Sequence, residues 1–257
     1  MRAMIFAAGL GTRLKPITDT MPKALVPVCG QPLLYHVINK LVAAGYDDLV
    51  VNVHHFPDQI IHYLHSHDFG ARIAVSDERD FLRETGGGIR YAKHLLTEDE
   101  IPGQAGNDGI EPFLVHNVDI VSNLDLGWLR EQFREGALAT LVASERKTQR
   151  YFLFDEDNRL KGWTNIATGE VRSPFPDIDP DRCRKLAFAG VHLMSPAIFE
   201  AFDRYGFGDS FSIVDFYLRA CADYPIYAAV PPVFTLVDVG KKETLSEAER
   251  VCEAILK

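Results

Sequence analysis

A strand-like apolar run at the start of the chain ends in a glycine turn, and two cations follow closely behind it. Residues 3–8 are apolar, Gly9 and Gly11 break the run, and Arg13 and Lys23 come next. Glycine lets the backbone approach an anion closely, and loop N–H groups can point at that anion. Arginine adds a planar fork for phosphate oxygens, and lysine adds a compact charge. The stretch therefore predicts a buried strand that leads into a phosphate-binding loop.

Two better-known phosphate loops do not match this stretch. A dinucleotide-binding fingerprint needs a third glycine, but the third position after Gly11 is Leu14. A P-loop needs Gly-Lys followed by Ser or Thr, and the chain has no such tripeptide. A nicotinamide-dependent dehydrogenase is therefore disfavoured, and so is a P-loop nucleotidase.

Strand-like and helix-like segments alternate after this loop. Apolar spacing predicts helices at residues 32–44 and 58–66, and buried strands at residues 49–53, 72–75 and 113–116. This alternation predicts an α/β protein with a mainly parallel sheet and helices on both faces. The chain has 257 residues, a length for which one domain is the default.

The second half of the chain has weaker signals. Residues 97–111 are polar and aperiodic, which predicts an exposed loop. Residues 151–154 and 160–163 read as a hairpin, and residues 244–256 read as a closing helix.

Charge and composition limit the partners of the chain. The net charge is −9 and there is no basic cluster, which argues against a nucleic-acid surface. No run approaches the roughly 18 to 20 apolar residues that span a bilayer, so we expect no membrane partner. Met1 and Arg2 lead directly into a strand-like segment, so we expect no signal peptide. The four cysteines are scattered, which predicts free thiols in a reducing cytoplasm.

Five histidines raise the question of a metal site. No familiar ligand spacing connects them, and His62 and His65 fall on the face of their predicted helix that is opposite the apolar one. A solvated histidine-rich helix is the prediction. The histidines are His54, His55, His62, His65 and His67.

Three further features could bind a ligand or a metal. The glycines at 86–88 precede a predicted helix and would admit a flat ligand, with a flexible turn as the alternative. Asp119 follows the strand at 113–116, where open α/β sheets bind ligands and a carboxylate could hold Mg²⁺. Asp238 lies in an Asp-x-Gly that alone would read as a turn. Together with Asp119 it completes a carboxylate pair.

Three motifs together resemble the signature of the sugar-phosphate nucleotidyltransferases. They are Gly9-Leu10-Gly11-Thr12-Arg13-Leu14-Lys15-Pro16, Pro22-Lys23-Ala24-Leu25-Val26-Pro27-Val28 and Gly30-Gln31-Pro32. Within that group the chain resembles N-acetylmuramate-1-phosphate uridylyltransferases and mannose- and heptose-phosphate guanylyltransferases. The resemblance implies a Rossmann-like three-layer α/β/α fold with a mostly parallel mixed central sheet. It also implies one domain over residues 1–257, with a nucleotide-binding part near 1–120 and a sugar-binding part near 121–240.

The resemblance implies roles for individual residues as well. Arg13 would hold the leaving pyrophosphate, and Lys23 would neutralise the α-phosphate. Asp119 and Asp238 would hold Mg²⁺, although Val118 stands where the family has glycine, which alters the local turn. The nucleotide would lie against Ala8, Gly9, Gly11, Thr12, Glu78, Gly86 and Gly87.

The sugar side departs most from the family. A Glu-Lys pair that contacts the sugar phosphate in many relatives is replaced by a stretch, Trp163-Thr164-Asn165, that has no lysine. Arg146 or Arg150 is expected to replace that charge, unless their loop is a solvated charge run. Gly190 resembles the glycine that admits the hexose. The candidate sugar-phosphate residues are thus Arg146, Arg150, Asn165 and Gly190.

These features predict an Mg²⁺-dependent transfer from a nucleoside triphosphate to a sugar 1-phosphate, with release of pyrophosphate. The segment 84–89 and the lack of an added C-terminal domain favour UTP and N-acetylmuramate 1-phosphate. Guanylyl transfer to a mannose or heptose phosphate is the alternative. A non-catalytic nucleotide-sugar-binding regulatory protein is the alternative of another class, and the presence of both carboxylates argues against it. The sequence does not fix the oligomeric state, and a homo-oligomer is one of the states it allows.

Overall fold

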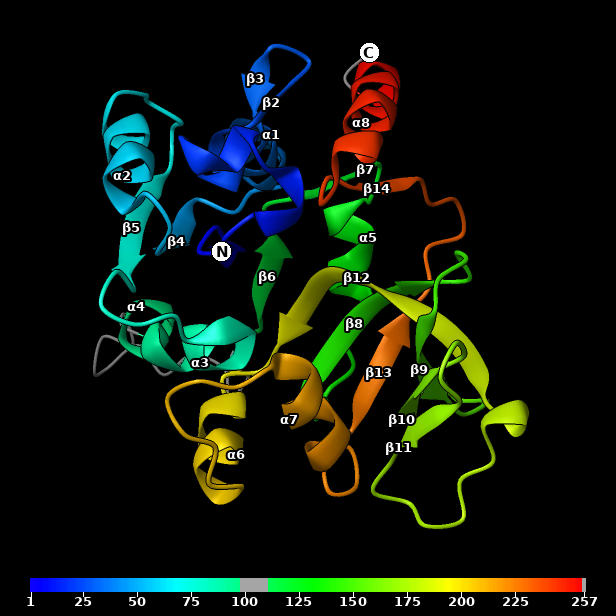
Figure 1. Cartoon of the computed structure of the whole chain (residues 1–257). Coiled ribbons are helices and arrows are strands. Elements are labelled where there is room, and N and C mark those ends of the chain that lie inside the picture. The colour runs from blue at the N-terminus through cyan, green and yellow to red at the C-terminus, as the bar shows by residue number, and fades with distance from the viewer. Residues whose placement is uncertain (98–110, 256–257) are drawn as a thin grey trace.

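A mixed sheet of ten strands forms the centre of the part of the chain that the structure, a computed structural model, describes: residues 1–97 and 111–255. Residues 98–110, most of the loop predicted at 97–111, lie outside that part. Helices cover both faces of the sheet (Figure 1), which confirms the predicted α/β class. In order across the sheet the strands are β11 (Glu170–Arg172), β10 (Leu160–Asn165), β9 (Arg150–Phe154), β12 (Arg184–Met194), β6 (Phe113–Asn117), β1 (Arg2–Phe6), β4 (Asp48–Val53) and β5 (Arg72–Asp77), with β8 (Ala139–Ser144) on β12 and β13 (Ile226–Ala229) on β8.

The sheet is parallel from β6 to β5 and becomes antiparallel where β12 joins it. Strands β6, β1, β4 and β5 pair in parallel, whereas β12 runs antiparallel to β6, β8 and β9. In β1, Ala3 and Ile5 belong to the core on one face and Met4 to the core on the other. Successive side chains of a strand point to opposite faces. A strand covered on both faces is therefore a continuous apolar run, as residues 3–8 predicted.

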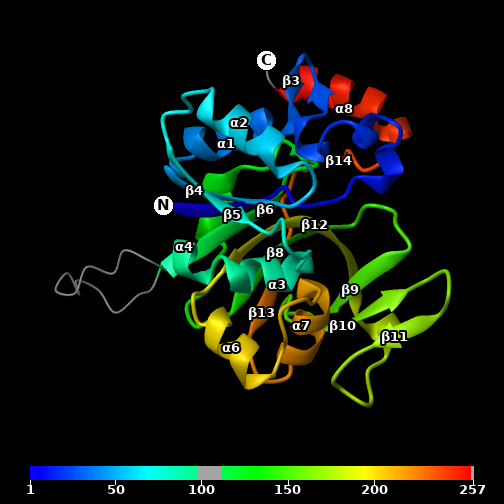
Figure 2. The same cartoon turned by 60° about the vertical axis from the view of Figure 1, so that its left-hand side comes forward.

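Two helical layers bury these faces, as the rotated view shows (Figure 2). One layer consists of α1 (Leu33–Ala43), α2 (Pro57–His65), α5 (Leu126–Glu131) and α8 (Lys242–Ile255). The other consists of α3 (Glu84–Tyr91), α4 (Lys93–Thr97), α6 (Ile198–Arg204) and α7 (Ile213–Ala220). The helices predicted at 32–44, 58–66 and 244–256 correspond to α1, α2 and α8, and the hairpin predicted at 151–163 corresponds to β9 and β10.

Short elements complete the molecule around the first strand. Three 3-10 turns follow β1, namely Thr12–Leu14, Ile17–Asp19 and Lys23–Leu25, before the ribbon of β2 (Pro27–Val28) and β3 (Gln31–Pro32). A second antiparallel ribbon joins β7 (Ile120–Ser122) to β14 (Leu236–Asp238). This ribbon returns the end of the chain to the residues that follow β6.

The histidines of α2 lie in solvent, as a solvated histidine-rich helix predicts. His62 and His65 are exposed on α2, and no group of three potential metal ligands occurs in residues 1–97 and 111–255. Within these same stretches, every helix is too short or too polar to cross a bilayer.

The prediction that the glycines at 86–88 precede a helix is wrong. The glycines do not precede a helix; they lie inside α3, which begins at Glu84. A Cβ at Gly86 would meet Phe211 Cε2 at 2.2 Å, and one at Gly87 would meet the Asp209 carbonyl oxygen at 2.3 Å. The backbone of Gly86 donates to Phe211 O at 2.8 Å. These glycines therefore let the segment before α7 pack against the backbone of α3.

We expect Gly86→Ala to destabilise the protein by about 2 to 3 kcal/mol, because the added methyl group would overlap a buried ring and overpacking costs that much. Gly208→Ala is the matched control, since a Cβ there meets nothing within 4 Å. Urea unfolding of both variants measures the difference. Equal stability of the two variants would show that the Phe211 ring moves aside.

Two buried histidines should make the folded protein less stable at acid pH. Burial lowers the pKa of His116 to about 4 and that of His192 to about 3, from an ordinary value of 6.5. Below pH 6.5 these histidines are protonated in the unfolded chain but stay neutral in the folded protein. We therefore expect the free energy of unfolding to decrease from pH 6.5 down to the folded pKa values. Lowering the pH through the folded pKa values can remove up to roughly 3 kcal/mol at His116 and roughly 5 kcal/mol at His192, since one pKa unit corresponds to about 1.4 kcal/mol. Urea unfolding between neutral and acid pH should show this slope, and His192→Gln should flatten it; an unchanged slope would contradict the assignment.

Candidate active site

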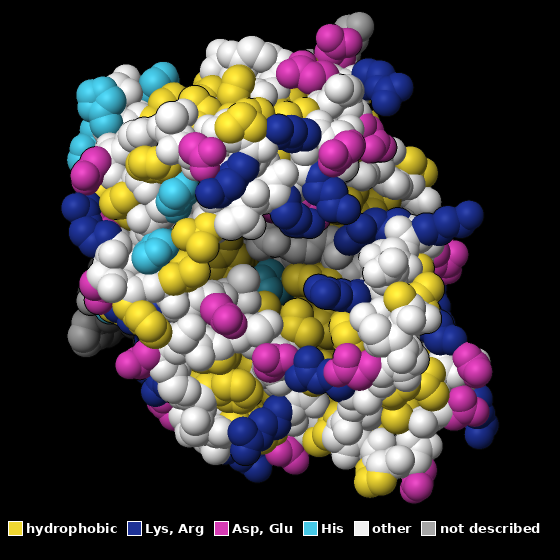
Figure 3. Space-filling view, in the orientation of Figure 1, with side chains coloured by type: hydrophobic (Ala, Val, Ile, Leu, Met, Phe, Trp, Pro, Cys, Tyr) yellow, Lys and Arg dark blue, Asp and Glu magenta, His cyan; other side chains and the backbone are white. Residues whose placement is uncertain are grey.

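A cleft opens at the carboxyl ends of β1 and β6, where open α/β sheets bind ligands. Its volume is about 410 Å³, and its lining comes from the loop after β1, the residues after β6, the start of α3 and the residue before α7. In the orientation of Figure 1 the surface is hollowed near its centre, and Lys and Arg side chains gather along the rim (Figure 3). A concave site with cationic walls attracts an anionic ligand.

Asn52 shapes the start of the glycine loop. It is buried near the end of β4, and its Oδ1 accepts the N–H groups of Ala7 at 2.8 Å and Ala8 at 3.3 Å. Its Nδ2 donates to Glu78 Oε1 at 2.7 Å. Because Asn52 uses the first two loop donors, we expect backbone contacts to a phosphate from Gly9 onward.

Gly11 allows the loop to turn back on itself. Its φ is +64°, and a Cβ there would lie 2.8 Å from Thr18 Cγ2 and 3.2 Å from Lys23 Cβ. The Thr18 hydroxyl donates to the Gly11 carbonyl oxygen at 2.8 Å. A larger residue at 11 would clash and strain the backbone, so glycine is required where the loop passes Lys23. Thr12 and Arg13 follow on the exposed 3-10 turn.

The two candidate metal aspartates lie together beside Lys23. Lys23 Nζ forms a short ion pair with Asp119 Oδ2, and these side chains are only 11% and 18% exposed. The ribbon of β7 and β14 pairs Asp238 with Ile120, and Val239 N–H donates to Asp119 O at 2.8 Å. The structure thus brings Asp119 and Asp238 to one point, as their predicted shared role requires.

Asp238 is in an unusual electrostatic environment. Burial and then the Asp119 carboxylate raise the pKa of Asp238. Three nearby cations oppose this shift: Lys23, Arg13 and Arg146. A buried carboxylate with a like charge beside it is costly unless a cation is added.

Arg13 lies against the same carboxylate. A Cβ at Gly240 would be 2.6 Å from Arg13 Nη2 and 2.7 Å from Asp238 Oδ1. The glycine of the Asp-x-Gly motif therefore makes room for a guanidinium group at the site. Arg13 stays exposed on its other side, where it can reach an anion in the cleft.

The donor set fits Mg²⁺. Asp238 Oδ1 is buried and has no hydrogen-bond partner among the described residues. Mg²⁺ is bound through one or two carboxylates, with waters and substrate phosphate oxygens completing six positions. Asp119 and Asp238 supply that number, and no third acidic or histidine ligand joins them in the described stretches. An unpartnered buried oxygen next to a second carboxylate is what such an ion would satisfy.

The predicted sugar-phosphate residues do not all converge. Arg146 donates from Nη2 to Phe188 O at 2.9 Å, and its charge acts on Asp238. Arg150 is exposed at the start of β9, opposite Asn165 on β10. The Asn165 side chain accepts the Ala167 N–H at 3.1 Å and so forms a turn. Of these residues, the structure ties Arg146 to the carboxylates.

Glycine is required at position 190 for a packing reason that the sequence did not reveal. Its φ is +72°, and a Cβ there would lie 2.7 Å from Asn117 Nδ2. The glycine therefore admits the side chain of Asn117, which lines the cleft, and its contact with a hexose stays a prediction.

The predicted base contacts lie mostly below the cleft surface. Glu78 is fully buried, its Oε2 accepts the Arg83 N–H at 3.4 Å, and burial raises the pKa of its carboxyl. Gly86 and Gly87 are buried against the segment before α7. Their contact with a base stays a prediction, and the residues of this region that do line the cleft are Leu82, Glu84 and Thr85.

Sequence reasoning missed several cleft residues. Asn52, Asn117 and Ser212 line the cleft but were not among the candidates. A signal existed for Asn52, because a polar residue inside the apolar run 49–53 needs a buried partner. Ser212 also caps α7, because its hydroxyl oxygen accepts the Val214 N–H at 3.2 Å.

Comparisons with known proteins agree with this geometry. The nucleotidyl transferase family profile matches residues 2–152. The N-acetylmuramate alpha-1-phosphate uridylyltransferase of Caulobacter vibrioides is 32% identical over 98% of this chain and 97% of its own length. The mannose-1-phosphate guanyltransferase of Eremothecium gossypii is 28% identical over 78% of this chain, and the match spans 51% of that relative.

Two solved structures share the fold. A UDP-glucose pyrophosphorylase complexed with UDP-glucose superposes with a TM-score of 0.74 at 18% identity, over 98% of both chains. HddC from Yersinia pseudotuberculosis superposes with a TM-score of 0.74 at 21% identity, over 97% of this chain and 98% of its own. The three-layer arrangement with a mixed sheet is therefore the fold of this group.

Proposed function

Because the chain belongs to the nucleotidyl transferase family, we propose that this enzyme makes UDP-N-acetylmuramate and pyrophosphate from UTP and N-acetylmuramate 1-phosphate, with Mg²⁺. The substrate choice is supported by the uridylyltransferase of Caulobacter vibrioides, which matches over nearly the whole of both chains. The observation that carries the proposal is the convergence of Arg13, Lys23 and Arg146 on the carboxylates of Asp119 and Asp238. Cations around a carboxylate pair suit phosphoryl chemistry.

The proposed reaction is one in-line displacement. An oxygen of the sugar 1-phosphate attacks the α-phosphorus of UTP, and the bond from that phosphorus to the bridging oxygen of pyrophosphate breaks. The attacking phosphate oxygen is already ionised near neutral pH, so no general base is required. Catalysis then depends on positioning and on neutralising charge.

Each cation has a separate place in this scheme. Lys23 is mostly buried beside Asp119, where its ammonium group would neutralise the α-phosphate. Arg13, from the loop side of Asp238, would hold the leaving pyrophosphate. Asp119 and Asp238 would hold Mg²⁺, which when bound would neutralise charge on the phosphate oxygens.

We expect Arg146→Met to raise KM for the sugar 1-phosphate about tenfold, because one charge-assisted hydrogen bond contributes roughly 1.5 to 3 kcal/mol. Arg150→Met is the matched control, since Arg150 is an exposed cation where the same loop enters β9 and makes no ion pair among the described residues. Initial rates at varied sugar 1-phosphate measure both variants. A raised KM in Arg150→Met alone would reverse the assignment of the two arginines.

A substrate panel tests the proposed function. Each of four nucleoside triphosphates is combined with several sugar 1-phosphates, and pyrophosphate release is measured with and without Mg²⁺. We expect the highest kcat/KM with UTP and N-acetylmuramate 1-phosphate. Efficient use of GTP with no use of UTP would overturn the choice and favour the guanylyl alternative, which the relative from Eremothecium gossypii supports. No pyrophosphate from any pair, with tight nucleotide-sugar binding, would favour the non-catalytic alternative.

A further inference from the structure

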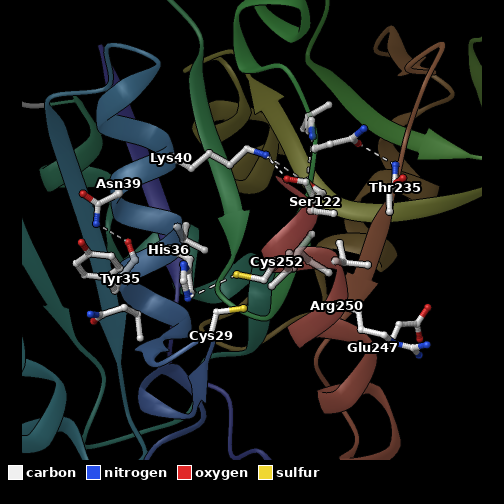
Figure 4. A pocket seen from close by; sticks show the side chains of 18 of the residues that line it. Cys29, Tyr35, His36, Asn39, Lys40, Ser122, Thr235, Glu247, Arg250 and Cys252 are labelled. Carbon is white, nitrogen blue, oxygen red and sulfur yellow. Dashed lines mark hydrogen bonds between the residues drawn. The ribbon is translucent and has the colours of Figure 1, made fainter. Parts of the chain in front are cut away.

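A second and larger cavity lies behind the ribbon of β7 and β14, away from the cleft. Its volume is about 1100 Å³, and it is enclosed by α1, by the residues of β7 and the turn after it, and by α8 (Figure 4). None of its lining residues lines the active-site cleft. The proposed reaction therefore makes no use of this space.

Lys40 reaches into this cavity from α1. Its Nζ donates to the Ser122 carbonyl oxygen at 2.6 Å and lies 3.4 Å from the Ser122 hydroxyl. No carboxylate of the described residues lies within 4.0 Å of this amine to form an ion pair. Burial lowers the pKa of Lys40 to about 8, although Asp125 acts in the other direction. A partly buried ammonium group held only by neutral oxygens gains stability from an anion.

The remaining walls combine apolar surface with a second cation, Arg250, and one carboxylate, Glu247, at the edge. Val121, Leu124 and Val251 contribute aliphatic surface, and Tyr35 adds a ring. Arg250 projects from α8 at the edge of the cavity and, like Lys40, has no ion-pair partner among the described residues (Figure 4). Small-molecule sites have such a composition, with apolar walls and a few placed polar groups. The volume also exceeds what a bare inorganic anion needs.

We propose that this cavity binds an organic phosphate whose anionic group pairs with Lys40 and whose flat apolar body fills the space between α1 and α8. The phosphate would supply the negative charge that the buried amine lacks. Arginine at the edge would add a fork for the remaining phosphate oxygens. One wall of the site is the ribbon whose strands lead from Asp119 and end at Asp238. A ligand bound in the cavity would thus contact the ribbon that positions both candidate metal ligands.

The test uses 1-naphthyl phosphate as the probe, and isothermal titration calorimetry as the readout, on the full chain. We expect saturable binding to the wild type and at least about tenfold weaker binding to Lys40→Met, because an ion pair with a partly buried amine contributes about 1.4 kcal/mol or more. Binding of 1-naphthol, which lacks the anion, should be weaker by a similar factor. Lys23→Met, a change at a residue that lines the cleft and not the cavity, should leave the Lys40-dependent binding in place and reveals any probe that binds in the cleft.

A second variant guards against a folding defect in Lys40→Met. Ala43→Trp keeps the amine but fills the space, because Ala43 lies on α1 at an exposed edge of the cavity. It should also lose the probe while its melting temperature stays near that of the wild type. The proposal is overturned if the wild type does not bind the probe. It is also overturned if Lys23→Met loses binding while Lys40→Met keeps it. A dimer of the wild type that Ala43→Trp dissociates would overturn it too, because the cavity would then be a dimer interface. These readouts need no turnover, so they are independent of the proposed reaction.

Discussion

Replacing Lys23 with methionine is expected to lower kcat/KM by roughly 10²-fold or more, because removing one preorganised charge from the reacting phosphate costs about 3 kcal/mol of barrier. Methionine keeps most of the aliphatic stem of a side chain that is only 11% exposed, so the packing changes little. The loss should fall mainly on kcat, since the α-phosphate gains charge in the transition state. Pyrophosphate release under saturating and limiting UTP separates the two constants.

Lys15→Met is the matched control for this variant. Lys15 lies on the same loop, but its side chain is 61% exposed and pairs with Asp19 at 3.0 Å, away from the carboxylates. A surface change of this kind should alter kcat/KM by no more than about twofold. If Lys23→Met retains nearly full turnover while Asp119→Ala abolishes it, the role assigned to Lys23 is wrong. Lys23→Arg should recover little activity, because a planar guanidinium does not replace a compact ammonium in a confined site.

The second large effect is expected at Asp238. Asp238→Asn removes one of the two carboxylates proposed to hold Mg²⁺, and we expect roughly a 10²- to 10³-fold loss of kcat/KM, since metal ions supply several kcal/mol of charge stabilisation. The Mg²⁺ concentration for half-maximal rate should rise as well. Titration of the rate with MgCl₂ measures both quantities. A rate and Mg²⁺ dependence equal to those of the wild type would remove Asp238 from the metal site.

Stability distinguishes a functional role of Asp238 from a structural one. The pKa of Asp238 is raised by burial and by Asp119, so ionisation of this group costs folding free energy above its ordinary pKa. Without metal, Asp238→Asn should therefore have a melting temperature at or above that of the wild type, although its kcat/KM is strongly reduced. Asp157→Asn, at an exposed acid in the turn between β9 and β10, should change neither property. A large fall in melting temperature would instead indicate that Asp238 supports the fold.

Local patterns predicted most elements of this fold. The continuous apolar run at 3–8, the helical spacing in 32–44 and the glycine turn between them all depend on neighbours within a few positions. Those features reappear as β1, α1 and the loop of Gly9 and Gly11. Chain order and motif resemblance also identified Arg13, Lys23, Asp119 and Asp238 as candidates.

Sequence patterns do not identify the role of a residue whose type serves two purposes. Glycine serves a close ligand and a close side chain equally well, so the pattern at 86–88 could not reveal that the Phe211 ring occupies the space beside Gly86. Gly190 is a similar case, because it makes room for Asn117. A lysine on an amphipathic helix normally reaches solvent, and only the packing of α1 against β7 brings the amine of Lys40 to the Ser122 carbonyl oxygen and partly buries it.

The sequence by itself determined the class of fold and the residue types available for chemistry, and it predicts that the first loop binds phosphate, because these inferences depend on short-range periodicity and on side-chain charge. The tertiary structure decided which of those residues meet. Asp119 and Asp238 are far apart along the chain, and only the register of β7 with β14 brings them together. Arg146 approaches the same point through its bond to Phe188. Such contacts depend on strand pairing and burial over long distances in sequence, which local patterns do not encode.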